Sequence, residues 1–101
     1  MRGGGPIAPR GALPAGAEPY RTIGPFDAQT LPKGLRGEHN LKQGTWGVIE
    51  LSAGALRFVW DDEAGGVEEL AAPATLIVPP EVLHHVEGEG PFAFSITFNR
   101  A

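Results

Sequence analysis

Proline and glycine residues interrupt this chain along its whole length. Its 101 residues include 10 prolines and 15 glycines, and no window of about eleven residues keeps the 3.6-residue apolar period of an amphipathic helix. From residue 20 onward, short apolar runs alternate with turn residues about every eight to twelve positions, which is typical of an all-β chain. We therefore expect about eight short strands, over residues 20–23, 35–40, 45–51, 55–60, 67–70, 75–78, 83–87 and 92–99.

Two of these segments alternate apolar and other residues with a period of two. The apolar positions are Leu56, Phe58 and Trp60 in one segment and Phe92, Phe94, Ile96 and Phe98 in the other. Successive side chains of a strand point to opposite faces, so one face of each segment is predicted to be core. Residues 52–54 predict a tight hairpin and residues 61–66 a looser one. The pattern indicates a sandwich or a small jelly-roll barrel of antiparallel strands.

The first 19 residues differ from the rest of the chain. They hold four prolines and five glycines and few large apolar side chains, so they bury too little surface to offset their own ordering entropy. We expect residues 1–19 to form an extended arm that is either disordered or laid along the domain or a neighbouring subunit. Residues 20–101 are expected to form one β-barrel domain.

Composition limits where such a protein works. There is no cysteine, which excludes disulfides, thiolate ligands and cysteine nucleophiles. No apolar run approaches the roughly 20 residues that cross a bilayer, and Met1-Arg2 leads into Gly and Pro instead of the apolar core of a secretory signal. The sequence therefore predicts a cytoplasmic protein without a membrane partner.

The charge balance argues against nucleic acid as a partner. The formal net charge is −4 and the isoelectric point is about 5.2, whereas nucleic-acid binding depends on clustered Lys and Arg. Lys33, Arg36 and Lys42 form the only local basic grouping. Two interpretations are open: a solvated loop, or a rim that attracts a small anion to a pocket.

The candidate site rests on histidine. Of the three histidines, His84 and His85 follow the double proline Pro79-Pro80, and His39 lies in another expected strand. A neutral imidazole is a common ligand of divalent metals. Glu81 lies three residues before His84 across a turn and is the leading carboxylate ligand. Adjacent strand residues face opposite ways, so only one of His84 and His85 is expected to face the interior.

The spacing around these histidines resembles the cupin motifs. Residues 79–84 match Pro-x-Gly-x-x-His with Glu81 in the glycine place. Counting back from residues 52–54 sets His39 in the first histidine place of the other motif, with Leu41 and Trp46 in two further ligand places. The resemblance implies a cupin-like jelly-roll barrel over roughly residues 20–99 that keeps His39 and His84 and departs from the pattern at Leu41 and Trp46.

A narrower resemblance covers two separated runs. Residues 35–49 (LRGEHNLKQGTWGVI) and 80–87 (PEVLHHVE) look like the TehB/YeaR-like cupin domain, a small domain that also occurs fused ahead of tellurite-resistance methyltransferases. The resemblance implies a link to tellurite, other oxyanions or oxidative stress. It does not imply methyl transfer, because the chain has no Gly-rich βαβ cofactor-binding unit.

These observations lead to three hypotheses. In the first, the chain is a metal-binding cupin, expected to be a homodimer, in which His39, His84 and Glu81 hold Zn, Ni or Fe, with redox or O2-dependent chemistry if it is an enzyme. Trp46, Arg36, Lys42 and His85 would then form the pocket wall or rim. In the second, it is a non-catalytic sensor of a metal or small anion. In the third, it is a structural β-barrel whose histidines hold no metal.

Overall fold

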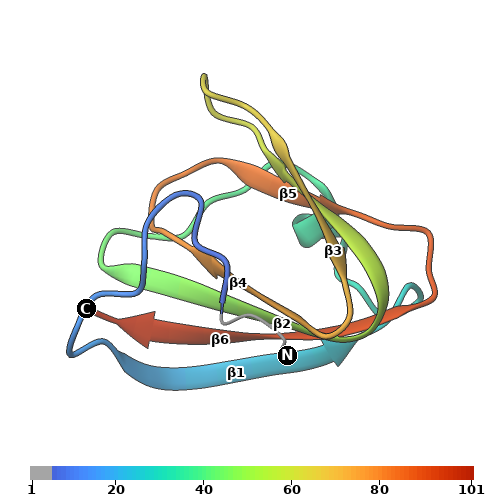
Figure 1. Cartoon of the computed structure of the whole chain (residues 1–101), viewed down its shortest axis with the longest axis horizontal. Helices are drawn as coiled ribbons and strands as arrows, with labels where there is room; N and C mark the ends of the chain where they lie inside the picture. The colour runs from blue at the N-terminus through green and yellow to red at the C-terminus, as the bar shows by residue number, and fades with distance from the viewer. Residues whose placement is uncertain (1–5) are drawn as a thin grey trace.

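The computed structural model describes residues 6–101, and it is an all-β structure (Figure 1). This confirms the all-β part of the predicted fold class. Residues 6–101 form six antiparallel strands in place of about eight, together with one short helix. The elements are β1 (Glu18–Phe26), α1 (Lys33–Arg36), β2 (Thr45–Trp60), β3 (Val67–Ala71), β4 (Ala74–Val78), β5 (His84–Glu87) and β6 (Phe92–Arg100).

Strand β2 organises the whole fold. Its first part, residues 45–54, pairs with β6 and β4, and its second part pairs with β3 and β5. The predicted tight hairpin at residues 52–54 is therefore wrong. The chain bends there without turning back, at a bulge between Leu51 and Ala53, and Gly54 adopts a φ of 73°. A glycine takes this left-handed conformation without steric cost, so the strand changes direction while its ladder continues.

The sheet remains open. Its strand order is β1-β6-β2-β3, with β4 and β5 also paired to β2, so the bent β2 belongs to two layers (Figure 1). Within residues 6–101, β1 pairs only with β6 and β3 only with β2. The expected closed jelly-roll barrel is thus not observed. Pro19 and Pro25 lie in edge strand β1, as is usual for proline, which has no N–H to donate to a further strand.

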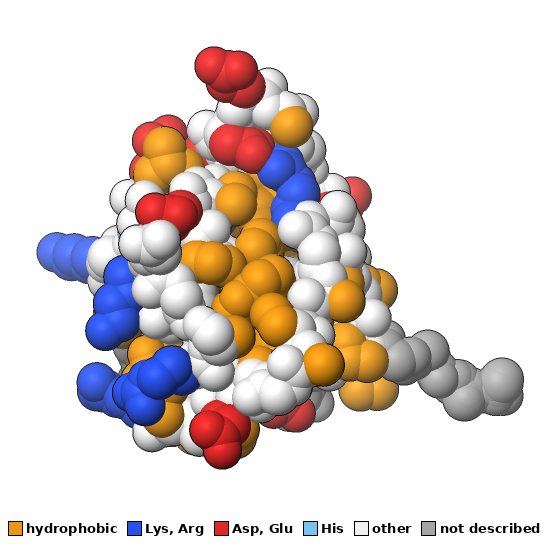
Figure 2. Space-filling view, turned by 90° about the vertical axis from the view of Figure 1, so that its left-hand side faces the viewer, with side chains coloured by type: hydrophobic (Ala, Val, Ile, Leu, Met, Phe, Trp, Pro, Cys, Tyr) orange, Lys and Arg blue, Asp and Glu red, His pale blue; other side chains and the backbone are white. Residues whose placement is uncertain are grey.

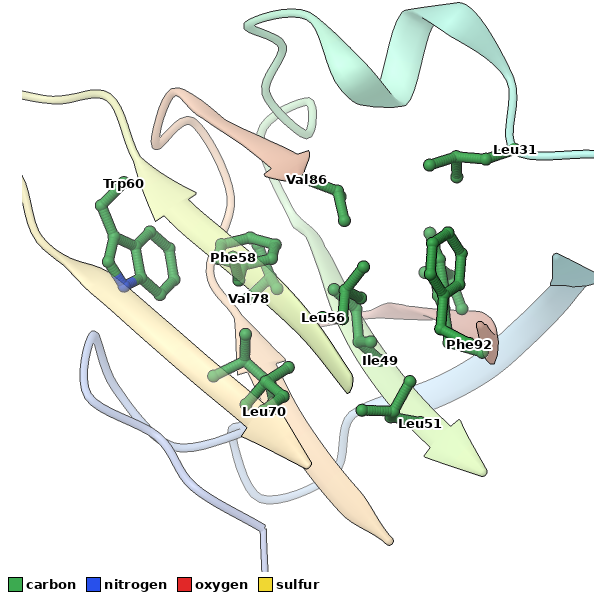
Figure 3. Close-up of a cluster of buried hydrophobic side chains, with 13 residues drawn as sticks. Leu31, Ile49, Leu51, Leu56, Phe58, Trp60, Leu70, Val78, Val86 and Phe92 are labelled. Carbon is green, nitrogen blue, oxygen red and sulfur yellow. The ribbon is translucent and has the colours of Figure 1, made fainter. Parts of the chain in front are cut away.

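The core lies between the two layers. Figure 3 shows side chains of β2, β3, β4, β5 and β6 converging there, with Leu31 added from the segment before α1. The predicted alternation is confirmed, because Leu56, Phe58 and Trp60 are all buried, as are Phe92, Phe94 and Ile96. Phe98 is half-buried. The two inner faces of a bent sheet thus share one hydrophobic core.

Residues 6–17 lie along the domain, which is one of the arrangements expected for the arm. Ile7 bridges Leu76 at the edge of β4, and the Ile7 amide donates to the Thr75 carbonyl at 2.9 Å. Arg10 forms an ion pair with Asp62 in the β2–β3 hairpin, and its guanidinium carbon lies 4.7 Å from the centre of the Trp60 ring. Residues 1–5 lie outside the described part of the chain.

The segment expected as a strand over residues 35–40 is different. Helix α1 occupies its start, and the only ladder contact is an isolated antiparallel bridge between His39 and His84. The helix begins after Pro32 and ends before Gly37, whose φ of −100° and ψ of 164° are already those of extended backbone, so α1 is a single turn. No helix in residues 6–101 is long and apolar enough to cross a membrane.

Candidate functional site

The structure brings His39 and His84 together. Each backbone amide donates to the carbonyl of the other residue, at 2.9 Å from His39 and 2.8 Å from His84. The ring centres are 4.2 Å apart, and the rings cross at 76°. His84 begins β5 and is held against Trp60 of β2 in the ladder. The double-proline segment and the extended segment after α1 thus meet at one pair of imidazoles.

Both rings border an apolar cavity of about 180 Å³. It lies between the layers, and its walls come from α1, β2, β4, β5, β6 and the segment between α1 and β2. Phe58 forms part of the wall and packs against His84, with 4.8 Å between ring centres. The other lining side chains are aliphatic or aromatic, including Leu35, Leu41, Ile49, Val78, Ile96 and Phe98.

The hydrogen bonds of the two imidazoles fix their tautomers. Nδ1 of His39 lies 2.8 Å from the Gly37 carbonyl, and Nδ1 of His84 lies 2.8 Å from the Val82 carbonyl. A carbonyl oxygen only accepts, so each Nδ1 must carry the proton. In the neutral rings, both Nε2 atoms therefore keep an unshared electron pair. Carbonyl partners of this kind orient histidine ligands in metal sites.

Burial keeps His84 neutral. Its side chain is only 3% exposed. Desolvation, with a smaller contribution from His39, lowers the pKa of His84 to about 4. A buried imidazole with so low a pKa holds no proton on Nε2 at neutral pH. It is available as an acceptor or a ligand.

His85 faces the other way and does not line this cavity. Its Nδ1 lies 2.7 Å from the Asp61 carboxylate and its Nε2 lies 2.8 Å from the Glu87 carboxylate. The hydrogen bonds to Glu87 and then Asp61 raise the pKa of His85. The two carboxylates lie on opposite sides of the ring, so this group stabilises an imidazolium and does not converge on one ion.

The structure does not bring Glu81 to the histidine pair. Glu81 is exposed, has a φ of 67° and donates its amide to the Leu41 carbonyl at 2.8 Å. Its side chain does not line the cavity. Across residues 6–101, no cluster of three or more His, Cys, Asp or Glu side chains is arranged to hold a metal ion. The double-proline turn positions the Glu81 backbone, and this leaves its carboxylate in solvent.

Trp46 does not line the cavity either. The alternation along β2 buries Thr45, Gly47 and Ile49, whereas Trp46 is on the other face. There Trp46 lies next to the arm, since a Cβ atom added at Gly11 would be 3.7 Å from the Cη2 atom of Trp46. Gly47 lines the cavity instead. Side chains of a strand alternate with a period of two, so counting back from Ile49 predicts that Gly47 shares its face. Counting from the cupin motif pointed to Trp46 instead.

The basic residues lie in grooves beside the cavity. The Arg36 guanidinium donates to the carbonyls of Gly88 at 3.0 Å and Ala28 at 3.1 Å, and it borders a groove that meets the cavity at Val86. Lys42 borders another groove that meets it at Leu41. Figure 2 shows a band of hydrophobic side chains with Lys and Arg side chains on both sides of it, most of them along one side.

Two solved structures resemble this chain throughout the domain. A protein from E. coli strain K12 is 25% identical, with a TM-score of 0.79, and the match covers 89% of this chain and 96% of that one. TehB from Haemophilus influenzae is 24% identical, with a TM-score of 0.75 over 83% of this chain. This chain spans only 31% of that TehB. No curated protein matches the sequence.

The family follows from a separate comparison. The sequence pattern of the TehB-like domain matches residues 21–96, which include most of β1, all elements from α1 to β5, most of β6 and both histidines of the pair. Strand β1 starts just before this match, and the arm lies outside it. The chain belongs to the TehB-like domain family.

Proposed function

We propose that this protein is a binding module that holds a divalent metal ion through Nε2 of His39 and His84. One observation carries the proposal: both Nδ1 atoms donate to backbone carbonyls, so two Nε2 electron pairs are left beside one cavity. Imidazole nitrogen suits Zn, Ni and Fe. The residues fit such an ion in part, since they supply two ligands, and water or a small molecule would complete the shell. A bound ion would act as a Lewis acid.

A binding or sensing role is favoured over catalysis with O2. The iron sites that activate oxygen use two histidines and one carboxylate, and Glu81 does not reach this cavity. Within the same proposal, the two layers around the histidines form a cupin-like site that is open along one edge. We further propose a homodimer in the cytoplasm.

The physiological role in this proposal is a response to stress from tellurite, related oxyanions or oxidants. Membership of the TehB-like domain family supports it. We expect a host that produces this protein to tolerate a higher tellurite concentration than a host that produces the His39→Ala, His84→Ala variant. Growth across a tellurite series measures the difference. Equal tolerance with both proteins at equal abundance would remove the stress role and leave metal binding as a separate question.

Metal analysis tests the binding site. We expect the purified protein, after dialysis against Zn, Ni or Fe(II), to retain about one equivalent of metal, and the His39→Ala, His84→Ala variant to retain less than about one-tenth, because two of its ligands are lost. His85→Ala is the matched control, since it removes a histidine outside the cavity and should retain the metal. Elemental analysis gives the stoichiometry. Less than one-tenth equivalent in the unchanged protein would favour the structural β-barrel.

A further inference from the structure

The side chains that line the cavity beside His39 and His84 limit which kinds of organic molecule can bind there. Apart from the two imidazoles, its lining side chains are hydrocarbon, and no Lys, Arg, Asp or Glu of residues 6–101 is among them. Arg36 and Lys42 border only the neighbouring grooves. A free anion inside such a space would lose its hydration and find no charge to compensate it. The cavity therefore disfavours anions.

The polar side-chain atoms among the residues that line the cavity are those of the two imidazoles. Because each Nδ1 donates to a carbonyl, an uncharged ring has an acceptor and no further donor at Nε2. A ligand that leaves these acceptors unpaired loses the hydrogen bonds they make to water, whereas a ligand with an O–H or N–H group replaces them. The site is therefore expected to bind a molecule that has a hydrogen-bond donor more tightly than a molecule of the same shape that lacks one.

The volume limits the size of the ligand. An engineered cavity of about 150 Å³ lined by Leu, Ile and Phe binds benzene in a protein interior, and this one measures about 180 Å³. Phe58 offers a flat wall next to the acceptors, with its ring tilted by 31° to that of His84. One six-membered ring with one small substituent matches this space.

We infer that the His39–His84 cavity binds a small, neutral, mostly apolar molecule that carries a single hydroxyl or N–H donor, of which phenol is the simplest example. The hydroxyl donates to Nε2 of His39 or His84, and the ring lies against Phe58 and the aliphatic wall. This inference rests on the proposed function only in using the same cavity. It does not require a metal.

The experiment compares phenol with toluene, which has the same shape and no donor. Both are titrated into protein freed of metal by a chelator, and dissociation constants come from ¹H–¹⁵N spectra. Replacing His39 by Phe removes one acceptor and keeps a ring of similar size. His84→Phe does the same for the other acceptor. We expect the ratio of phenol affinity to toluene affinity to fall by about 3- to 10-fold in whichever of the two variants removes the acceptor of the hydroxyl, the effect of one net hydrogen bond.

Three further measurements serve as controls for this test. Toluene binding to His39→Phe shows that the cavity persists in the variant, and His85→Gln, which changes a histidine outside the cavity, should leave the ratio unchanged. Phenol should also shift the ¹⁵N resonance of Nε2 in His39 or His84. A ratio that falls in neither His39→Phe nor the corresponding His84→Phe variant, or no binding of either molecule to the unchanged protein, would overturn the inference. Metal retention, measured separately, would still report on the proposed function.

Discussion

Replacing Gly54 by alanine is expected to destabilise the fold by about 2–6 kcal/mol, or to prevent folding. A Cβ atom at this position would lie 1.9 Å from the Pro91 carbonyl oxygen and 2.8 Å from the Phe92 Cα. These are backbone atoms and cannot rotate away. An alanine would also be strained at a φ of 73°. The steric overlap and the backbone strain each cost about 1–3 kcal/mol. Urea denaturation of the two proteins measures the difference in unfolding free energy.

Gly65→Ala provides the matched control. Gly65 has a φ of 64°, but a Cβ there would meet no atom within 4 Å. Its substitution should therefore cost only the backbone strain, about 1 kcal/mol. If Gly54→Ala and Gly65→Ala proved equally stable, the close approach of β2 to the segment before β6 would be wrong.

The Gly54 bend also matters for the candidate site. It carries Phe58 and Trp60 from one layer to the other, and Trp60 pairs with His84 in the β2–β5 ladder. A variant that straightens this bend would displace the wall of the cavity together with one imidazole. We therefore expect any folded Gly54→Ala protein to lose binding at the His39–His84 cavity as well.

Acid is expected to destabilise the metal-free protein through His84, by about 3 kcal/mol between pH 7 and pH 4. Its pKa falls from 6.5 to about 4 on folding. As the pH drops through 6.5, the unfolded chain takes up a proton that the folded protein refuses, so the unfolded state gains stability. The loss continues down to the folded pKa, and each pH unit corresponds to about 1.4 kcal/mol. Denaturation midpoints across this range in the presence of a chelator measure it.

The His84→Gln variant isolates the effect, because its side chain does not titrate. Carboxylates such as Asp27 and Asp62 also lose favourable interactions in acid, since hydrogen bonds lower their pKa values, but they do so in both proteins. The unchanged protein should therefore show the steeper loss of stability. Parallel pH profiles for the two proteins would mean that His84 is not buried as an uncharged ring.

His85 should act in the opposite direction. Its pKa is raised by Glu87 and Asp61, so its contribution to stability is present below pH 6.5 and is lost as the pH rises through the folded pKa. The His85→Gln variant should accordingly lose more stability in acid than the unchanged protein does. Two neighbours in sequence thus oppose each other because one faces the core and the other faces two carboxylates.

Much of the fold could be predicted from local pattern. The frequent Pro and Gly breaks exclude long helices, and the period of two in residues 56–60 and 92–98 identifies buried faces that the structure confirms. These predictions hold because side-chain alternation is a property of any strand. The predicted hairpin at residues 52–54 was wrong because a glycine that permits a turn equally permits a bend, and the partner strands decide between the two. The predicted strand over residues 35–40 was also wrong.

From the printed sequence one can predict an all-β chain and single out His39 and His84 as candidate ligands. Three features are visible only in the folded protein: the two rings meet beside an apolar cavity, His85 and Trp46 face away from it, and Glu81 remains in solvent. Which imidazole is buried, and which of its nitrogens holds the proton, depend on carbonyls and walls contributed by segments far apart in the chain, whose approach no local pattern records.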